Sequence, residues 1–245
     1  MNWTWFHKWT SPKWFYQMSK AWLPWLSSIA LITILTACVW GLLFAPEDWQ
    51  QGNSFRIFYI HVPSAILAQS VLLMMAIAGI VSLVWRIKLA DIFIKVAAPF
   101  GASVTFLALV TGSIWGKPTW GTWWVWDARL TSTLVQFFLY LGVIGIFSAI
   151  ENFQTAARAA ALTSIVATVN IPIIKFSVNW WQTLHQPATF KVTEAPAMPA
   201  EMWLPGLIMV VGFYALFGAL MFSRIQSEII YRDRDSRWVR DLFAN

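Results

Sequence analysis

The residues of this sequence best suited to chemistry are a tryptophan-rich segment and two of its three histidines. The Trp-rich segment, residues 115–127, reads W-G-K-P-T-W-G-T-W-W-V-W-D, and its tryptophans are Trp115, Trp120, Trp123, Trp124 and Trp126. If its second half is helical, four side chains spaced i, i+3, i+4 and i+7 share one face, namely Trp120, Trp123, Trp124 and Asp127. A shelf of indole rings that ends in a carboxylate would suit a large flat ligand. The alternative is an aromatic belt at a membrane surface.

His61 and His185 could supply metal ligands. Imidazole binds iron well, and a histidine pair is a common way to hold haem iron. Zinc is less favoured, because its third ligand would have to be a scarce carboxylate such as Asp127 or Glu47. A single histidine at such a place is usually a hydrogen-bonded surface residue, so the haem interpretation depends on both histidines flanking the Trp-rich segment.

A porphyrin would also need cations for its propionates. Arg56, Lys117 and Arg129 are expected on the same side of the membrane as the two histidines. Arg129 lies two residues beyond Asp127, so a local ion pair that orients the loop is the alternative for this arginine. Arg56 precedes His61 by five residues, and its alternative role is an anchor at the start of a helix.

The elements that must position these residues are membrane-spanning helices. The chain has 245 residues, of which 58% are hydrophobic and 11% charged, whereas soluble domains carry about 25% charged residues. Six apolar stretches are long enough to cross about 30 Å of hydrocarbon as helices. They cover residues 22–44, 56–85, 92–114, 130–150, 157–178 and 203–222. The sequence therefore predicts an all-α polytopic membrane protein with six transmembrane helices and a single membrane domain, residues 1–245.

The basic residues predict how the helices are oriented. Six spans place both termini on one side, and that side would carry twelve of the 17 lysines and arginines. The other five are Arg56, Lys117, Arg129, Lys175 and Lys191. The positive-inside rule then places both termini in the cytoplasm, and it also accounts for the net charge of +6. Two long loops, residues 45–55 and 179–202, would lie on the periplasmic face together with the histidines and the Trp-rich segment.

Three parts of the domain are expected to differ in environment. Residues 1–21 interleave aromatic side chains with lysines, which is typical of a segment that lies on a membrane surface. Residues 22–222 would form the six-helix bundle, including the region 115–129. Residues 223–245 would form a basic cytoplasmic tail.

Several functions are excluded by what the sequence lacks. Cys38 is the single cysteine, so there is no disulfide framework, no cysteine metal site and no C-x-x-C-H motif for covalent haem attachment. Gly112, Gly116 and Lys117 resemble the end of a nucleotide-binding loop, but the glycines are one residue too close and no Ser or Thr follows the lysine. We expect neither an enzyme nor a nucleic-acid-binding protein.

Three motifs together resemble a known family. Residues 120–132, W-G-T-W-W-V-W-D-A-R-L-T-S, resemble the WWD signature of the haem-handling membrane proteins of cytochrome c maturation. H-V-P-S-A at His61 and W-W-Q-T-L-H-Q-P around His185 follow the pattern of the CcmC family in the same order. The resemblance covers residues 22–222.

The resemblance implies a specific role. A CcmC-like protein binds haem b non-covalently at the periplasmic face of the bacterial inner membrane, with His61 and His185 as axial ligands and the WWD region against the macrocycle. It presents haem to the periplasmic haem chaperone CcmE, and it acts with the ATP-binding-cassette pair CcmA and CcmB and with the small protein CcmD. Two other classes stay open: an electron-transfer cytochrome b, and a structural membrane subunit of a transporter whose Trp-rich loops are docking surfaces.

Overall fold

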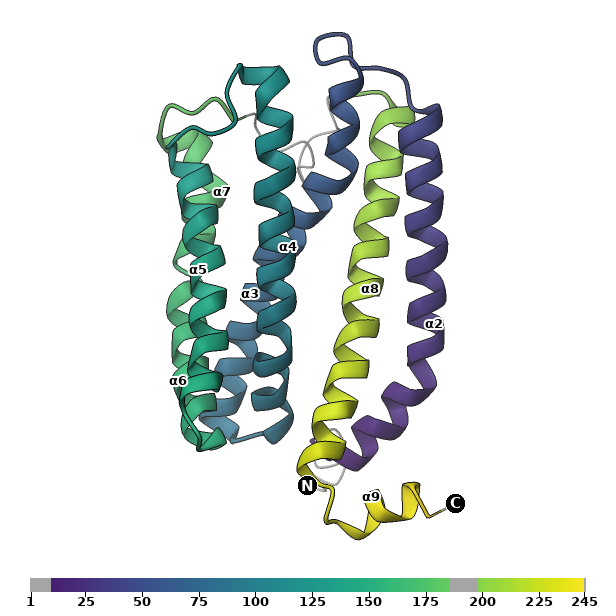
Figure 1. Cartoon of the computed structure of the whole chain (residues 1–245), viewed down its shortest axis with the longest axis vertical. Coiled ribbons are helices and arrows are strands. Elements are labelled where there is room, and N and C mark those ends of the chain that lie inside the picture. The colour runs from purple at the N-terminus through teal and green to yellow at the C-terminus, as the bar shows by residue number, and fades with distance from the viewer. Residues whose placement is uncertain (1–9, 186–197, 245) are drawn as a thin grey trace, which may run out of the picture.

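A computed structural model of the chain describes residues 10–185 and 198–244. It confirms the all-α fold, with six helical segments long and apolar enough to span a membrane (Figure 1). The first nine residues of the predicted interfacial segment, with His7, and the proline-rich part of the loop 179–202 lie outside the described residues.

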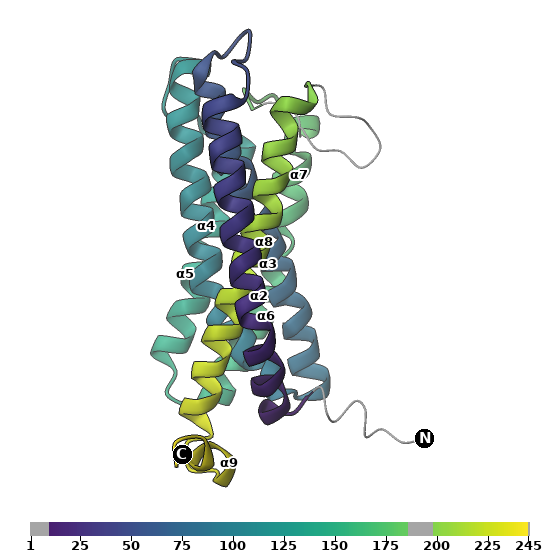
Figure 2. The same ribbon diagram turned by 90° about the vertical axis from the view of Figure 1, so that its right-hand side faces the viewer.

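The long helices run lengthwise in an elongated bundle (Figure 2). The long ones are α2 (Pro12–Val39), α3 (Phe58–Trp85), α4 (Lys88–Trp120), α5 (Ala128–Ala149), α6 (Phe153–Ala167), α7 (Asn170–Trp180) and α8 (Ala200–Arg232). Three short ones are the π-helix η1 (Trp40–Phe44), the 3-10 helix η2 (Asn53–Ile57) and α9 (Arg237–Leu242).

The first span begins earlier than the apolar stretch predicts. α2 starts at Pro12 rather than at residue 22, because Ser11 caps it by accepting a hydrogen bond from the Trp14 amide, at 3.5 Å, and proline suits the first helical position. Pro24 lies inside α2. In Figure 1 the first turns of α2 lie at an angle to the rest of the helix.

The fifth predicted span consists of two helices. α6 ends at Ala167 and α7 begins at Asn170, with a turn at residues 168–169 between them. Pro172 has no amide hydrogen for the carbonyl of Thr168, four residues earlier, and its ring would clash with that carbonyl in a continuous helix. The Asn170 side chain donates to the Ser132 carbonyl at 2.8 Å, which ties the turn to α5.

Small residues allow the helices to pack closely, as is common within membranes. A Cβ on Gly79 would lie 2.9 Å from the Ala161 carbonyl oxygen, so α3 and α6 can approach this closely only with glycine there. Gly101 on α4 similarly makes room for the ring of Tyr140 on α5. The Tyr140 hydroxyl donates to the Ala68 carbonyl at 2.6 Å, which joins α5 to α3.

One end of the bundle collects the residues singled out in the sequence. α3 and α5 begin there, α4 and α7 end there, and α2 begins and α8 ends at the opposite end (Figure 1).

At that opposite end, Glu228 of α8 pairs with Lys95 of α4 and with Arg232, both at 2.7 Å. The Arg232 guanidinium also lies over the ring of Phe153, 3.2 Å from its centroid, which connects α8 to α6.

Candidate functional site

A cavity of about 530 Å³ lies among α3, α4, α5 and α7. This volume is within the range of about 300–1,000 Å³ that is usual for small-molecule and cofactor sites. The residues that line it include His61, His185, Trp115, Trp120, Trp124 and Arg129. Three parts of the chain that are far apart in sequence therefore meet around one space, as the sequence predicts for the two histidines and the Trp-rich segment.

His61 lies in the first turns of α3 and is held by α4. Its Nδ1 is 3.0 Å from the Ala108 carbonyl oxygen and 3.2 Å from Thr111 Oγ1. Because a carbonyl oxygen can only accept, Nδ1 carries the proton and Nε2 keeps a lone pair. Gly112 makes room for the ring, since a Cβ there would be 2.8 Å from His61 Cε1.

His185 follows α7, and its ring lies across from that of His61. The two ring centroids are 6.4 Å apart and the ring planes are inclined at 36°. The Trp120 indole lies against His185 with its centroid 5.8 Å away. The backbone amide of His185 donates to Thr183 Oγ1 at 3.1 Å, so Thr183 helps to fix the loop that carries this histidine.

Asp127 connects this loop to the start of α5. One carboxylate oxygen caps α5 by accepting from the Leu130 amide at 2.8 Å. The other oxygen accepts a hydrogen bond from the Thr183 hydroxyl. Asp127 therefore supports His185 indirectly, and its carboxylate is buried between the two elements.

Arg129 reaches from α5 to α7 and to His185. Its Nη1 lies 3.0 Å from His185 Nδ1, its Nη2 donates to the Lys175 carbonyl at 3.2 Å, and its Nε donates to Ser177 Oγ at 3.3 Å. These contacts place a guanidinium at the wall of the cavity, where it can also meet an anionic group.

The Trp-rich segment does not form the continuous helical face that the spacing predicts. That prediction is wrong because α4 ends at Trp120, where Gly121 takes a left-handed conformation with φ of 79°, and Asp127 starts a new helix. Trp115 and Trp120 thus line the cavity from α4, and Trp124 does so from the loop.

Two further tryptophans of the segment face outward. Trp123 is 55% exposed and Trp126 is 75% exposed, and the cavity lining does not include either of them. Trp126 nevertheless contacts the Trp124 ring, with centroids 5.5 Å apart. The segment therefore combines cavity-lining rings with an exposed aromatic surface.

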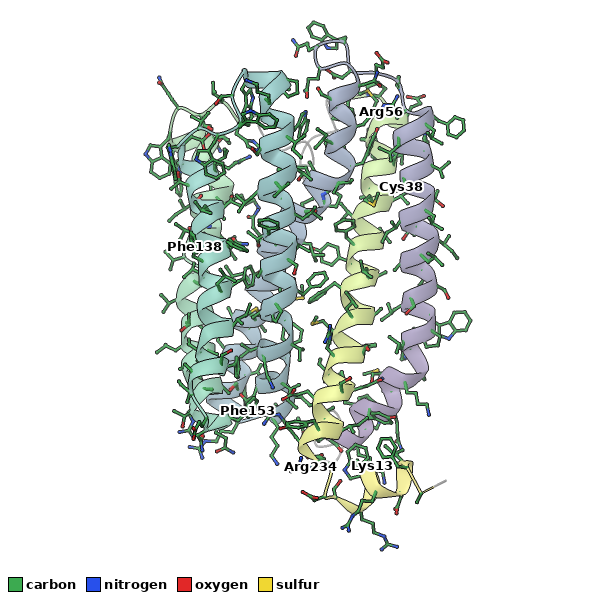
Figure 3. The ribbon with its side chains drawn as sticks, in the orientation of Figure 1. Lys13, Cys38, Arg56, Phe138, Phe153 and Arg234 are labelled. Carbon is green, nitrogen blue, oxygen red and sulfur yellow. The ribbon has the colours of Figure 1, made fainter. Side chains whose placement is uncertain are left out.

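Arg56 lies elsewhere at the same end of the bundle (Figure 3). Its guanidinium donates to the carbonyls of Gly41, Leu42 and Ala45, at 2.9, 2.6 and 3.2 Å. It thus provides hydrogen-bond donors for backbone carbonyls at the end of the first span. Its contacts are with the end of the first span, and Arg56 is not among the described residues that line the cavity. Lys117 donates to the Gly121 carbonyl at 3.0 Å at the end of α4, and it is not among the described residues that line the cavity.

One buried polar side chain of the cavity, that of Gln136, was not predicted from the sequence. Gln136 is fully buried, and both polar atoms of its amide lack a hydrogen-bond partner within the described ranges, as does Trp124 Nε1. Since buried polar groups are nearly always paired, these atoms indicate contacts to a ligand or to water. The spacing of Arg129, Thr133 and Gln136, at i, i+4 and i+7, could have identified a polar stripe on α5.

Asp127→Ala is expected to weaken both α5 and the His185 loop. Loss of a helix cap costs about 0.5–2 kcal/mol, and the Thr183 hydroxyl also loses its acceptor. We expect a lower Tm and a lower content of bound ligand in the purified protein, measured by thermal unfolding and absorption. Asp127→Asn is the matched control, because asparagine caps helices as well as aspartate does. Equal losses in both variants would contradict this role.

Comparison with known proteins agrees with the motifs. The sequence model of the family "Heme exporter protein C", also designated CcmC, matches residues 5–240. The chain is 45% identical over 240 residues to Heme exporter protein C of Haemophilus influenzae, covering 98% of each protein. It is 43% identical over 242 residues to that of Escherichia coli K12 (98% of this chain, 97% of the relative), and 45% identical over 222 residues to that of Bradyrhizobium diazoefficiens (91% and 84%). This chain therefore belongs to the Heme exporter protein C family.

Proposed function

We propose that the cavity binds haem b non-covalently, with His61 and His185 as its axial ligands. The observation that carries the proposal is the pair of imidazole rings with centroids 6.4 Å apart across the cavity. Metal–imidazole nitrogen bonds are about 2 Å long, so two imidazoles on opposite sides of one iron have their ring centres roughly 6 Å apart. His61 Nε2, whose lone pair is not used by Ala108 or Thr111, is suited to be one of these ligands.

The rest of the lining fits the same group. The indole rings of Trp115, Trp120 and Trp124 offer flat apolar surfaces to a macrocycle. Arg129 and Lys175 are cations at the cavity wall that suit propionates. Trp124 Nε1 and the Gln136 amide are hydrogen-bonding groups in the same lining. When bound, haem supplies the iron and a reactive vinyl edge, and the chain's own residues hold and orient it.

The proposed partner is the haem chaperone CcmE, with CcmA, CcmB and CcmD acting in the same system. The names of the relatives describe heme exporters, which supports a haem-handling role in cytochrome c maturation. We place the chain in the bacterial inner membrane with the cavity at the periplasmic face, from the distribution of lysine and arginine. Lipid would surround the exposed apolar faces of the helices.

Haem transfer fits better than electron transfer between two haems. The described residues contain one histidine pair. His61 lies near the start of α3 and His185 follows the end of α7, and both of these helix ends are at one end of the bundle (Figure 1). The exposed rings of Trp123 and Trp126 adjoin the cavity-lining Trp124 and offer a surface to a second protein. A site at the membrane surface lets such a partner reach the haem edge.

Transfer can be tested with purified components. We expect the haem-loaded protein to pass haem to a purified periplasmic domain of CcmE, in which the haem becomes covalently attached and survives denaturing electrophoresis. A CcmE variant that lacks its own haem-binding histidine is the control. Haem that stays on the membrane protein, together with rapid reduction by a quinol, would contradict transfer and favour the electron-transfer class.

A further inference from the structure

The two histidines differ in which ring nitrogen carries the proton, and therefore in whether a lone pair is available for a metal. His61 Nδ1 faces a carbonyl oxygen, which requires the proton on Nδ1 and leaves the Nε2 lone pair available. His185 Nδ1 faces Arg129 Nη1 at 3.0 Å, and a guanidinium can only donate. His185 Nδ1 must therefore accept, so in the neutral imidazole the proton is on Nε2.

In this arrangement His185 has no nitrogen lone pair to give to iron. Its Nδ1 lone pair is used by Arg129, and its Nε2 carries the proton. Ligation through Nε2 needs that proton to move to Nδ1, and ligation through Nδ1 needs the lone pair that Arg129 occupies. Both routes require the guanidinium to leave His185, whereas His61 can act as a ligand without any rearrangement.

We propose that Arg129 is a positioning residue that blocks His185 until an anionic group of the ligand, a haem propionate, draws the guanidinium away. This inference rests on the proposed haem site and adds an order to it: His61 binds first, and His185 follows only when Arg129 has a carboxylate partner. The reverse exchange, in which Arg129 returns to His185, removes one axial ligand and favours release of the haem.

The surroundings of Arg129 suit such an exchange. The guanidinium lines the cavity, so a ligand carboxylate can reach it without moving a helix. Its other contacts, to the Lys175 carbonyl and to Ser177 Oγ, anchor it to α7 while Nη1 changes partner. A guanidinium–carboxylate pair is stronger than the contact to a neutral imidazole, which gives the exchange its direction.

The resting state can be tested without haem. The chain has three histidines, so nitrogen-15 NMR of histidine-labelled protein in detergent resolves few signals, and His7→Ala and His61→Ala variants assign them. We expect His61 with its proton on Nδ1 and His185 with its proton on Nε2. A wild-type His185 that is protonated on Nδ1 would overturn the proposal, and this measurement does not depend on the haem assignment.

The exchange can be tested with two porphyrins. Haem has free propionates, whereas its dimethyl ester cannot recruit Arg129. In the wild type we expect the ratio of six- to five-coordinate iron to be about tenfold lower with the ester, judged by the absorption spectrum at saturation. In Arg129→Met we expect this difference between the two porphyrins to disappear.

Lys117→Met is the matched control, because Lys117 is a cation of the Trp-rich segment that caps α4 instead of contacting His185. It should keep the wild-type difference between the porphyrins. Equal six-coordinate fractions for both porphyrins in the wild type would contradict the proposed exchange of Arg129 from His185 to a propionate. An unchanged difference between the porphyrins in Arg129→Met would contradict it as well. A wild type that is five-coordinate with both porphyrins, and indifferent to His185→Ala, would instead contradict the ligand assignment itself.

Discussion

Replacing either cavity histidine with alanine is expected to lower the haem content of the purified protein about tenfold or more. In the proposed site each substitution removes one axial bond, and a tenfold loss of affinity corresponds to about 1.4 kcal/mol. His61→Ala should have the larger effect, because His61 is held in place by Ala108 and is already suited to bind iron. The measurement is the amount of haem per protein, from the spectrum of its pyridine complex, followed by loading of CcmE.

His7→Ala is the control for these variants, since His7 lies in the N-terminal segment and is expected to have no ligand role. It should purify with the wild-type haem content. If His61→Ala and His185→Ala also retained that content and loaded CcmE normally, the axial assignment would fail.

Gly112→Ala is expected to reduce haem binding about tenfold although it removes no ligand. The added methyl group would lie 2.8 Å from His61 Cε1, so the imidazole must move away from α4. That movement breaks the 3.0 Å hydrogen bond to the Ala108 carbonyl, which fixes both the ring orientation and the position of its proton. Overpacking of this kind typically costs about 1–3 kcal/mol.

Gly142→Ala is the matched control, because nothing lies within 4 Å of a Cβ built at Gly142, which is also inside a membrane helix. It should keep the haem content and can stabilise α5 slightly, since alanine favours helix over glycine by about 1 kcal/mol. Comparable haem loss in both variants would mean that the effect comes from helix packing in general and not from His61.

Much of the fold is predictable from the sequence because a membrane imposes simple constraints. Six apolar stretches must be helices. His61, the Trp-rich segment and His185 lie at the connections that follow the first, third and fifth spans, and these connections are at one end of the bundle because successive spans alternate in direction. The predicted ends were less accurate, since helices such as α8 continue to Arg232, well past the apolar stretch that ends at residue 222. The length of an apolar stretch reflects the thickness of the membrane, whereas the helix itself can continue beyond the membrane.

The conformation of the Trp-rich segment could not be predicted in the same way. The spacing of its tryptophans fits a helix, but Gly121 and the capping carboxylate of Asp127 end one helix and begin the next. Which rings line the cavity depends on this break. The loop turns Trp124 inward and leaves Trp126 exposed.

The partners of the two arginines also depend on contacts that sequence spacing does not contain. Arg56 reaches the carbonyls of residues 41, 42 and 45, which are unsatisfied because η1 ends there. Arg129 contacts His185, which is 56 residues away in sequence. Both contacts arise only when helices that are distant in sequence pack together.

The central claim is that His61 and His185 bind one iron, and the spectrum of the detergent-purified protein in its oxidised and reduced forms tests it most directly. We predict a six-coordinate low-spin haem spectrum in the wild type that changes to a five-coordinate or high-spin form in each single alanine variant. A protein without haem, or a spectrum that neither substitution alters, would contradict the bis-histidine site. The aromatic cavity would then be a docking surface for another protein.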